Sequence, residues 1–164
     1  MSTVLYLPGT PIVFAPVSYD ALLSAVSITN GAGRLSARHD RGSGALPARY
    51  AWDCRLETAA AATIGRALSL YWAGATAATG GTTCDGSFSE SDQAISSVEL
   101  LRNLRPMGIV QADTTANPGI FGGSGIVHIT RRYIQCGFWN NLGATLSGTN
   151  TKFVLTLTPI PDSW

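Results

Sequence analysis

The feature that most constrains this fold is a strict alternation of residue types near the end of the sequence. Large apolar side chains recur there at every second position, at Phe153, Leu155 and Leu157. A period of two places these side chains on one face of an extended strand, which predicts a half-buried β-strand. Pro159 and Pro161 then predict its end, because proline cannot donate a hydrogen bond to a neighbouring strand.

The same alternation occurs over residues 50–57, which we predict to be another strand. Its buried face is expected to carry Tyr50, Trp52, Cys54 and Leu56. The alternate residues Ala51, Asp53, Arg55 and Glu57 include three charged side chains, so the opposite face is expected to meet water. The remaining predicted strands are 66–73, 105–112, 125–130 and 132–140. Residues 95–104 are predicted to form a short helix or an irregular strand, and the glycine-rich run 122–125 to form a turn.

Short strands at this spacing, with little helix, predict an all-β fold in the form of a single-domain β-sandwich or jelly roll. A length of 164 residues suits one domain with a substantial core. We expect residues 18–164 to form this domain and residues 1–17 to form an extended N-terminal arm or an edge strand. Residues 30–49 hold four arginines among Gly, Ser and Ala, and they are expected to form a long flexible loop.

Charge is scarce in this chain. Asp, Glu, Lys and Arg make up 13% of the residues, against about 25% in typical soluble domains. Such a surface is either rich in uncharged polar residues or partly covered by a partner, and composition leaves both open. The net charge of +1 gives no global attraction to nucleic acid or to an anionic membrane, so we expect neither as a partner.

Arginine outnumbers lysine ten to one. Arginine is the better interface cation because its planar group is weakly hydrated and bonds bidentately, but arginine-rich codon usage produces the same bias. The cysteines lack metal-ligand spacing, and we expect Cys54 and Cys136 to be buried thiols in a reducing compartment. The N-terminal run has no basic start, and no apolar run reaches about 18 residues, so neither a signal peptide nor a membrane span is expected.

Catalytic chemistry finds no support in the sequence. A hydrolase requires a nucleophile, a base and an orienting group. His39 lies among arginines, His128 has the parity of a solvent-facing strand residue, and Ser43 lacks the spacing of a nucleophile elbow. We therefore expect no enzymatic activity.

Ion and cofactor sites are also weakly indicated. The acidic run 85–92 offers oxygen ligands for calcium at Asp85, Ser87, Ser89, Glu90 and Asp92. Its spacing does not match that of an EF-hand loop, so a solvated turn is the simpler interpretation. The glycine-rich run 122–125 has no lysine or helix after it, as a phosphate loop would. We expect no metal and no cofactor.

The C-terminal third is similar to a known class of proteins. The run from Arg132 to Leu146, which reads Arg-Tyr-Ile-Gln-Cys-Gly-Phe-Trp-Asn-Asn-Leu-Gly-Ala-Thr-Leu, is followed by Phe153-Val-Leu-Thr-Leu-Thr-Pro-Ile-Pro161. An Arg-Tyr strand, an Asn-rich turn and a last strand closing on proline resemble the ending of head decoration (cement) proteins of tailed bacteriophages. The likeness covers about the last 60 residues well.

This resemblance implies a β-sandwich or jelly-roll subunit that coats an icosahedral shell and clamps neighbouring capsid subunits, commonly as a trimer. Its partners would be the major capsid protein and further copies of itself. Its place would be the outer capsid surface of the virion, after synthesis in the host cytoplasm. The alternatives are a phage tail or baseplate subunit and a carbohydrate-binding jelly roll. A glycan site would use Tyr71, Trp139 and Trp164.

We predict that the arm and the arginine-rich loop bind the capsid. The arm contributes apolar side chains that a lone domain need not expose, and its prolines lower the ordering cost of docking. The loop contributes guanidinium groups for capsid carboxylates, since an acidic protein surface suits it better than nucleic acid. The predicted contacts are Leu5, Tyr6, Leu7, Ile12, Val13, Phe14, Arg34, Arg38 and Arg41.

Overall fold

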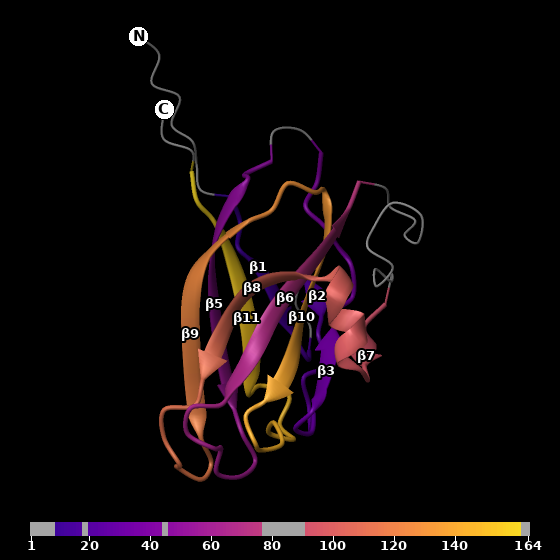
Figure 1. Cartoon of the computed structure of the whole chain (residues 1–164). Coiled ribbons are helices and arrows are strands. Elements are labelled where there is room, and N and C mark those ends of the chain that lie inside the picture. The colour runs from indigo at the N-terminus through magenta and orange to yellow at the C-terminus, as the bar shows by residue number, and fades with distance from the viewer. Residues whose placement is uncertain (1–8, 18–19, 44–45, 77–90, 162–164) are drawn as a thin grey trace.

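Two β-sheets pack face to face in the computed structural model, which describes residues 9–17, 20–43, 46–76 and 91–161 (Figure 1). Sheet A has the strand order β2 (Ala21–Leu22), β1 (Ile12–Ala15), β11 (Phe153–Pro159), β5 (Arg49–Glu57) and β9 (Ile120–His128). Sheet B has the order β7 (Gln93–Ile95), β3 (Ala32–Leu35), β10 (Tyr133–Asn141), β6 (Ala67–Ala75) and β8 (Arg105–Gln111). A short strand, β4 (His39–Asp40), also pairs with β10.

The all-β sandwich predicted from the sequence is confirmed. The strands predicted at 50–57, 66–73, 105–112 and 132–140 are β5, β6, β8 and β10, and the final alternating run is β11. The short helix predicted within 95–104 is present as a 3-10 helix, η1 (Val98–Asn103). Alternation succeeded for β5 and β11 because each has one face on the core and one toward solvent, whereas β10 is buried on both faces.

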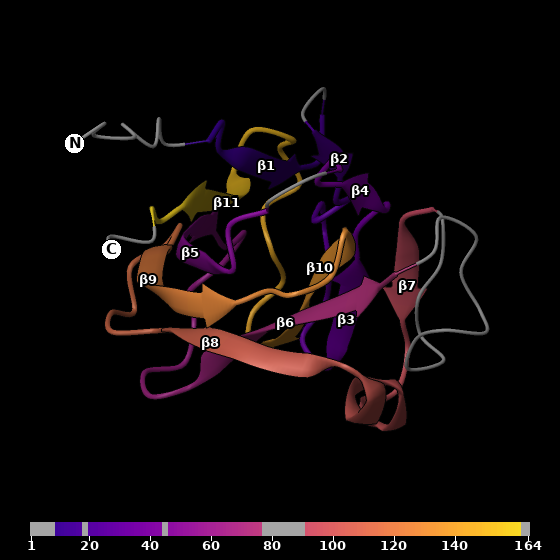
Figure 2. The same ribbon diagram turned by 90° about the horizontal axis from the view of Figure 1, so that it is seen from above.

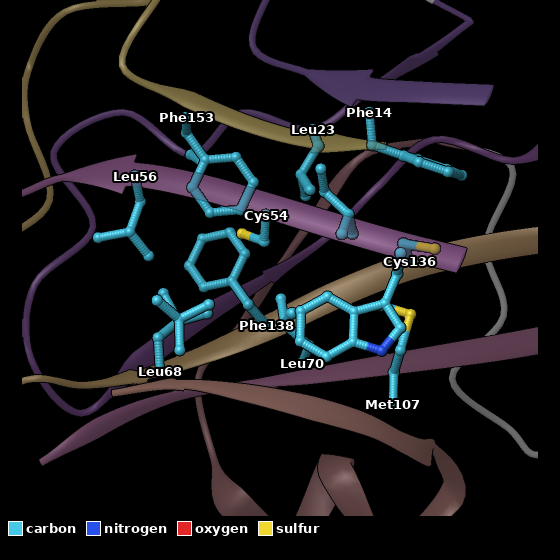
Figure 3. Close-up of a cluster of buried hydrophobic side chains, with 14 of the residues drawn as sticks. Phe14, Leu23, Cys54, Leu56, Leu68, Leu70, Met107, Cys136, Phe138 and Phe153 are labelled. Atoms are coloured by element: carbon cyan, nitrogen blue, oxygen red, sulfur yellow. The ribbon is translucent and has the colours of Figure 1, made fainter. Parts of the chain in front are cut away.

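The core lies between the two sheets and is built from the inward faces of their strands (Figure 3). Phe153 of β11 and Phe138 of β10 meet there with ring centroids 5.0 Å apart. The predicted inward residues of β5, from Tyr50 to Leu56, are all buried. Cys54 and Cys136 are buried thiols, as predicted, and burial raises the pKa of both. Burial of this apolar surface is the main force that joins the sheets.

The outer face of sheet B is covered by the chain itself. A second apolar cluster forms there, and it includes Ile95 of β7, Leu104 after η1 and Tyr133 of β10. Figure 2 shows β7 and η1 on the side of the molecule that sheet B occupies. Sheet A has no such cover among the described residues, so its outward side chains are exposed or half-buried.

The prediction that residues 30–49 form a flexible loop is wrong. Residues 32–35 are β3 and residues 39–40 are β4, and both pair with β10. These strands have four and two residues, which is too short for a period of two to be recognised in the sequence. The segment therefore forms part of sheet B.

The turn predicted at residues 122–125 is also wrong, because this run lies inside β9. The glycines make room for the indole of Trp52, which is buried between the sheets. A Cβ atom placed at Gly125 would lie 2.7 Å from Nε1 of Trp52, and one placed at Gly108 of β8 would lie 2.2 Å from its Cζ2. Trp52 thus holds the end strand of each sheet at one corner of the sandwich.

We predict that Gly125→Ala destabilises the protein by about 1–3 kcal/mol, because the added methyl group overpacks the rigid Trp52 ring. Gly122→Ala is the matched control in the same strand, since its Cβ would meet only an ordinary contact at 3.6 Å. The control should change the free energy of unfolding by less than about 0.5 kcal/mol. Denaturant titration of both variants measures this difference, and equal effects would show that Trp52 does not require the glycine.

Candidate interaction surface

The predicted capsid-contacting residues of the arm differ in how far the structure exposes them. Ile12 and Phe14 lie in β1 and are buried in the core, so the expectation that they are exposed is wrong. Val13 points outward and is half-buried. The alternation of β1 explains the division, because β1 pairs with β11 as an ordinary strand of sheet A. Leu5, Tyr6 and Leu7 lie outside the described residues.

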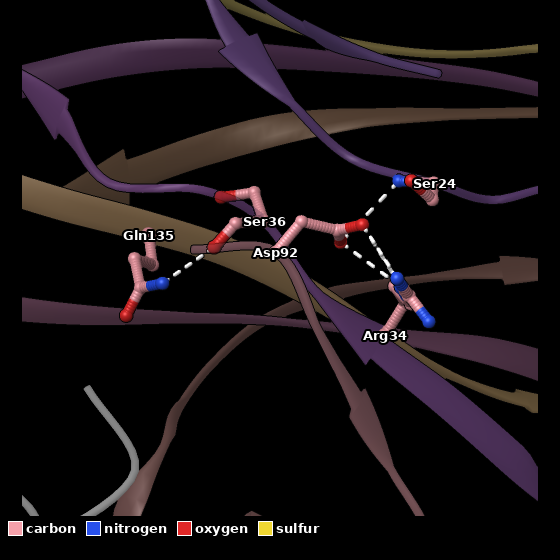
Figure 4. Close-up of polar contacts among 5 residues, drawn as sticks. All are labelled: Ser24, Arg34, Ser36, Asp92 and Gln135. Carbon is pink, nitrogen blue, oxygen red and sulfur yellow. Dashed lines mark hydrogen bonds and ion pairs between the residues drawn. The ribbon is translucent and has the colours of Figure 1, made fainter. Parts of the chain in front are cut away.

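Arg34 is engaged within the chain (Figure 4). Its guanidinium binds Asp92 bidentately, with Nη2 2.7 Å from Oδ2 and Nε 3.0 Å from Oδ1. The hydrogen bonds to Asp92 raise the pKa of Arg34. The backbone N–H of Ser24 also donates to the Asp92 carboxylate, at 3.4 Å. This ion pair joins β3 to the segment just before β7. The carboxylate of Asp92, which the sequence offered as a possible calcium ligand, is thus bound to Arg34.

Arg41 and Arg38 are also occupied by intramolecular contacts. The Nε of Arg41 donates to the Tyr50 hydroxyl at 3.0 Å, and its other nitrogens donate to backbone carbonyls, among them that of Ile129 at 3.1 Å. The Arg38 guanidinium lies 5.5 Å from the centre of the Tyr133 ring. The three arginines predicted to grip a capsid therefore hold loops and strands of this chain in place.

We predict that Arg34→Ala destabilises the protein by about 1.5–3 kcal/mol, because it leaves the largely buried Asp92 carboxylate without its charged partner. Arg102→Ala is the control, since its ion pair with Glu99 is solvent-exposed on η1. That control should cost less than about 0.5 kcal/mol. Thermal and chemical unfolding measure both values. A loss for Arg34→Ala no larger than that of the control would contradict a structural role for this ion pair.

A second ion pair predicts an acid dependence of stability. Arg132 binds both carboxylate oxygens of Asp40 at 2.8 Å. These hydrogen bonds lower the pKa of Asp40 from 3.8 to about 2. Because the folded-state pKa is lowered, the contribution is complete above the unfolded pKa and disappears as the pH falls toward 2.

Asp40→Asn should therefore lose less stability than the parent when the pH is lowered from about 5 to about 2. Arg132→Ala removes the partner of the carboxylate and should produce the same flattening. Urea unfolding at several pH values over this interval measures the slopes. If both variants keep the slope of the parent, this pair does not contribute to the acid dependence.

The outer face of sheet A has no covering element among the described residues. Its side chains alternate with the core residues of four strands, and all are exposed or half-buried. They are Val13, Arg49, Ala51, Asp53, Arg55, Glu57, Ile120, Gly122, Ser124, Ile126, His128, Val154, Thr156 and Thr158. The surface therefore combines two exposed isoleucines with charges of both signs, and we call it the sheet A face.

Arg55 is the exposed arginine in the middle of β5 on this face, whereas Arg49 lies half-buried at the end of the strand. Within the described residues Arg55 forms no ion pair and no side-chain hydrogen bond, whereas the neighbouring Glu57 accepts a bond of 2.8 Å from Lys152. A shallow hollow of about 360 Å³ lies beside it, lined in part by Ile120, Val154 and Lys152. This hollow can receive a carboxylate against Arg55 and an apolar side chain against Ile120.

Sequence reasoning missed Arg55 as a binding residue. The alternation of residues 50–57 correctly predicts that Arg55 lies on the solvent face, but the density of arginines in residues 30–49 favoured that segment as the binding site. The signal that could have identified it is position: Arg55 lies in the middle of a long strand, where neighbouring strands offer no carboxylate directly opposite. Its partners in register are Val154 of β11 and Gly122 of β9.

The other predicted sites receive less support. Tyr71 and Trp139 are half-buried in the cluster that covers sheet B, and Trp164 lies outside the described residues. His39 contacts the backbone carbonyl of Asp20 at 3.3 Å, and His128 is exposed on the sheet A face. In the described ranges, no three His, Cys, Asp or Glu side chains gather as a metal site. The helical part of those ranges includes no segment with the length and apolar character of a membrane span.

Comparison with known proteins returned no relative. The sequence matches no protein-family model, and it matches no curated protein.

Proposed function

We propose that this protein is a virion structural subunit that decorates and stabilises an icosahedral phage capsid by binding the major capsid protein. The observation that carries the proposal is the contrast between the two sheets. Sheet B carries a second apolar cluster on its outer face, to which Ile95 of its edge strand β7 and Leu101 of η1 contribute. Sheet A leaves a broad face with exposed isoleucines and an arginine that forms no ion pair among the described residues. A face of this kind suits docking onto another protein, because it combines apolar area with charges that fix the orientation.

The resemblance of the C-terminal third to head decoration proteins supports the choice of a capsid as partner. That third supplies β10 and β11, which are the middle strands of sheets B and A respectively. In this proposal the protein lies on the outer capsid surface and associates with further copies of itself. The resemblance implies that the assembly is a trimer.

The order of the strands supports a jelly-roll form of the sandwich. If β1, β3, β5, β6, β8, β9, β10 and β11 are counted as strands one to eight, sheet A reads 1-8-3-6 and sheet B reads 2-7-4-5. The chain thus passes back and forth between the sheets, as in a double Greek key. We propose this topology as the scaffold that places Arg55, on the third of these strands, at the centre of the sheet A face.

The geometry changes the proposed capsid contacts. The internal bonds of Arg34, Arg38 and Arg41 remove them as principal contacts, and the burial of Ile12 and Phe14 removes those side chains as well. We propose Arg55 as the main charged contact, facing a capsid carboxylate. Leu5, Tyr6 and Leu7 remain as proposed apolar contacts of the arm.

Co-sedimentation with purified capsid shells that lack this protein tests the proposal. We expect the parent to bind and Arg55→Ala to bind at least about tenfold more weakly, as expected for the loss of a desolvated charge contact. Arg102→Ala removes the same charge on η1, which covers the other sheet, and should bind like the parent. Failure of the parent to bind would refute decoration, and equal binding by both variants would move the interface away from the sheet A face.

A short deletion distinguishes the contribution of the arm to shell binding from the contribution of β1 to folding. Deleting residues 2–14 would remove most of β1 and so disturb the core, whereas deleting residues 2–8 leaves every described strand intact. We expect the shorter deletion to keep the parent's unfolding transition and to weaken shell binding. Circular dichroism melting serves as the control for folding. Unchanged shell binding by this variant would exclude the arm as a contact.

A tail or baseplate subunit remains the second candidate, because it would use the same docking chemistry at a different place. Incubation of the parent with separated heads and tails distinguishes the two locations. A carbohydrate-binding function receives no supporting observation, since the two described aromatic residues proposed for it are half-buried against their own chain.

A further inference from the structure

Strand β9 is an unprotected edge. It is the last strand of sheet A, it has nine residues, and its free side pairs with no strand among the described residues. Its sequence from Ile120 to His128 contains no proline, lysine, arginine or carboxylate. Soluble proteins usually protect long edge strands with such residues, because free N–H and C=O groups otherwise recruit another strand.

The neighbouring strand β8 does not block this edge. The side-chain direction of Gly123 points into the sandwich, and a Cβ there would meet the carbonyl oxygen of Ile109 at 2.9 Å. Strand β8 therefore passes beneath the inner face of β9 at this point and does not lie alongside it in the plane of sheet A. The backbone groups that β9 turns away from β5 remain open in that plane.

The exposed side of β9 is symmetric about its middle residue. Ile120 and Ile126, which are 51% and 60% exposed, lie at equal distances along the strand on either side of Gly123. Gly122 and Ser124, the small residues between them, are also exposed. We propose that β9 pairs antiparallel with the β9 of a second copy of this chain, about a two-fold axis through Gly123, so that the two sheets A form one continuous sheet.

This register makes the two strands complementary. Ile120 of each copy faces Ile126 of the other, and Gly122 of each faces Ser124 of the other. The two pairs of isoleucines bury apolar area that a lone chain exposes, and cross-strand pairs of β-branched residues stabilise a sheet. The glycines and serines between them add no bulk, so the two backbones can approach to the usual spacing of about 4.8 Å.

The charges beside β9 follow the same symmetry. Within one chain Arg55 lies opposite Gly122, and Asp53 lies opposite Ser124. In the proposed pair, Gly122 of one copy lies opposite Ser124 of the other. Arg55 of each copy therefore shares a row across the joined sheet with Asp53 of the other, and no like charges share a row. These charges lie three strand spacings apart, about 14 Å, and are largely screened. The placement of Ile120 and Ile126 at equal distances from Gly123 is what favours a second copy over an unrelated strand as the occupant.

The contact goes beyond the proposed function and does not rest on it. A two-fold contact forms in solution without a shell. On an icosahedral shell, which has both two-fold and three-fold axes, it would join copies that belong to neighbouring trimers. Oligomeric state and shell binding are measured separately, so failure of one leaves the other standing.

Sedimentation equilibrium of the purified full-length chain tests the proposal at concentrations up to about 1 mM, a range that detects weak association. We expect self-association that Ile120→Lys/Ile126→Lys weakens by at least about tenfold, because four lysines would face one another across the edge. Ile64→Lys is the matched control, since Ile64 is 60% exposed but lies outside the strands. A parent that is monomeric throughout, or a double variant that associates like the control, overturns the proposal.

Engineered cysteines test the register. Cys84 is first replaced by serine, so that the native cysteines left are the buried Cys54 and Cys136. In this background the double variant Gly122→Cys/Ser124→Cys should form a disulfide-linked dimer on mild oxidation, because residue 122 of each copy would lie opposite residue 124 of the other, within reach of a disulfide. In each single variant the new cysteine lies opposite a residue without a thiol. Oxidation of a single variant should therefore give no disulfide-linked dimer. Linkage of Ser124→Cys alone, or equal linkage of all three variants, overturns a two-fold axis at Gly123. Binding of a strand from another protein in place of a second copy would give no linked homodimer and likewise overturns it.

Discussion

The indole of Trp52 is the contact on which the corner of this sandwich depends. It projects from β5 in sheet A and touches β8 in sheet B and β9 in sheet A at positions where only glycine fits, at Gly108 and Gly125. A large rigid ring between two bare backbones fixes both how closely the sheets approach and where their end strands lie. Gly123 and Gly125 leave the middle of β9 without inward side chains, so the tryptophan determines the position of that part of the strand, while Phe121 and Val127 pack in the core at its two ends.

Intramolecular pairing determines which charges are left to act outside the molecule. Several of the scarce charges of this chain meet one another: Arg34 binds Asp92, Arg132 binds Asp40, and Lys152 binds Glu57. Each of these pairs joins segments distant in sequence, and together they hold short strands and loops that contribute little apolar surface. Asp53 and Arg55 differ because they follow each other on one face of a central strand, where their cross-strand neighbours are uncharged. The external chemistry of the protein therefore concentrates on the sheet A face.

The parts of the fold that could be predicted are those whose signal is local. The buried faces of β5 and β11 follow from a period of two that can be seen in a few consecutive residues. The glycines of β9 could not be understood locally, because their reason is a tryptophan on another strand, and glycine runs otherwise indicate turns. The engagement of Arg34 was equally hidden, since its carboxylate lies 58 residues away in the sequence. Protein docking stays a prediction of the sequence, and the residues now proposed for it could be chosen only with the register of the sheets.

In the proposed function the two sheets have different roles, because among the described residues only sheet B carries an apolar cluster on its outer face. Residues of β10 and β6 belong to this cluster together with Ile95 of the edge strand β7 and Leu101 of η1, so apolar contacts stabilise those two strands from both sides. Sheet A is stabilised from the core alone, and its outer side chains are free to meet a partner. A flat face and an open edge on the same sheet point in perpendicular directions, so contact with a shell beneath the face does not compete with strand pairing along the edge. This separation is what a subunit needs if it is to bind a curved lattice and its own neighbours at the same time.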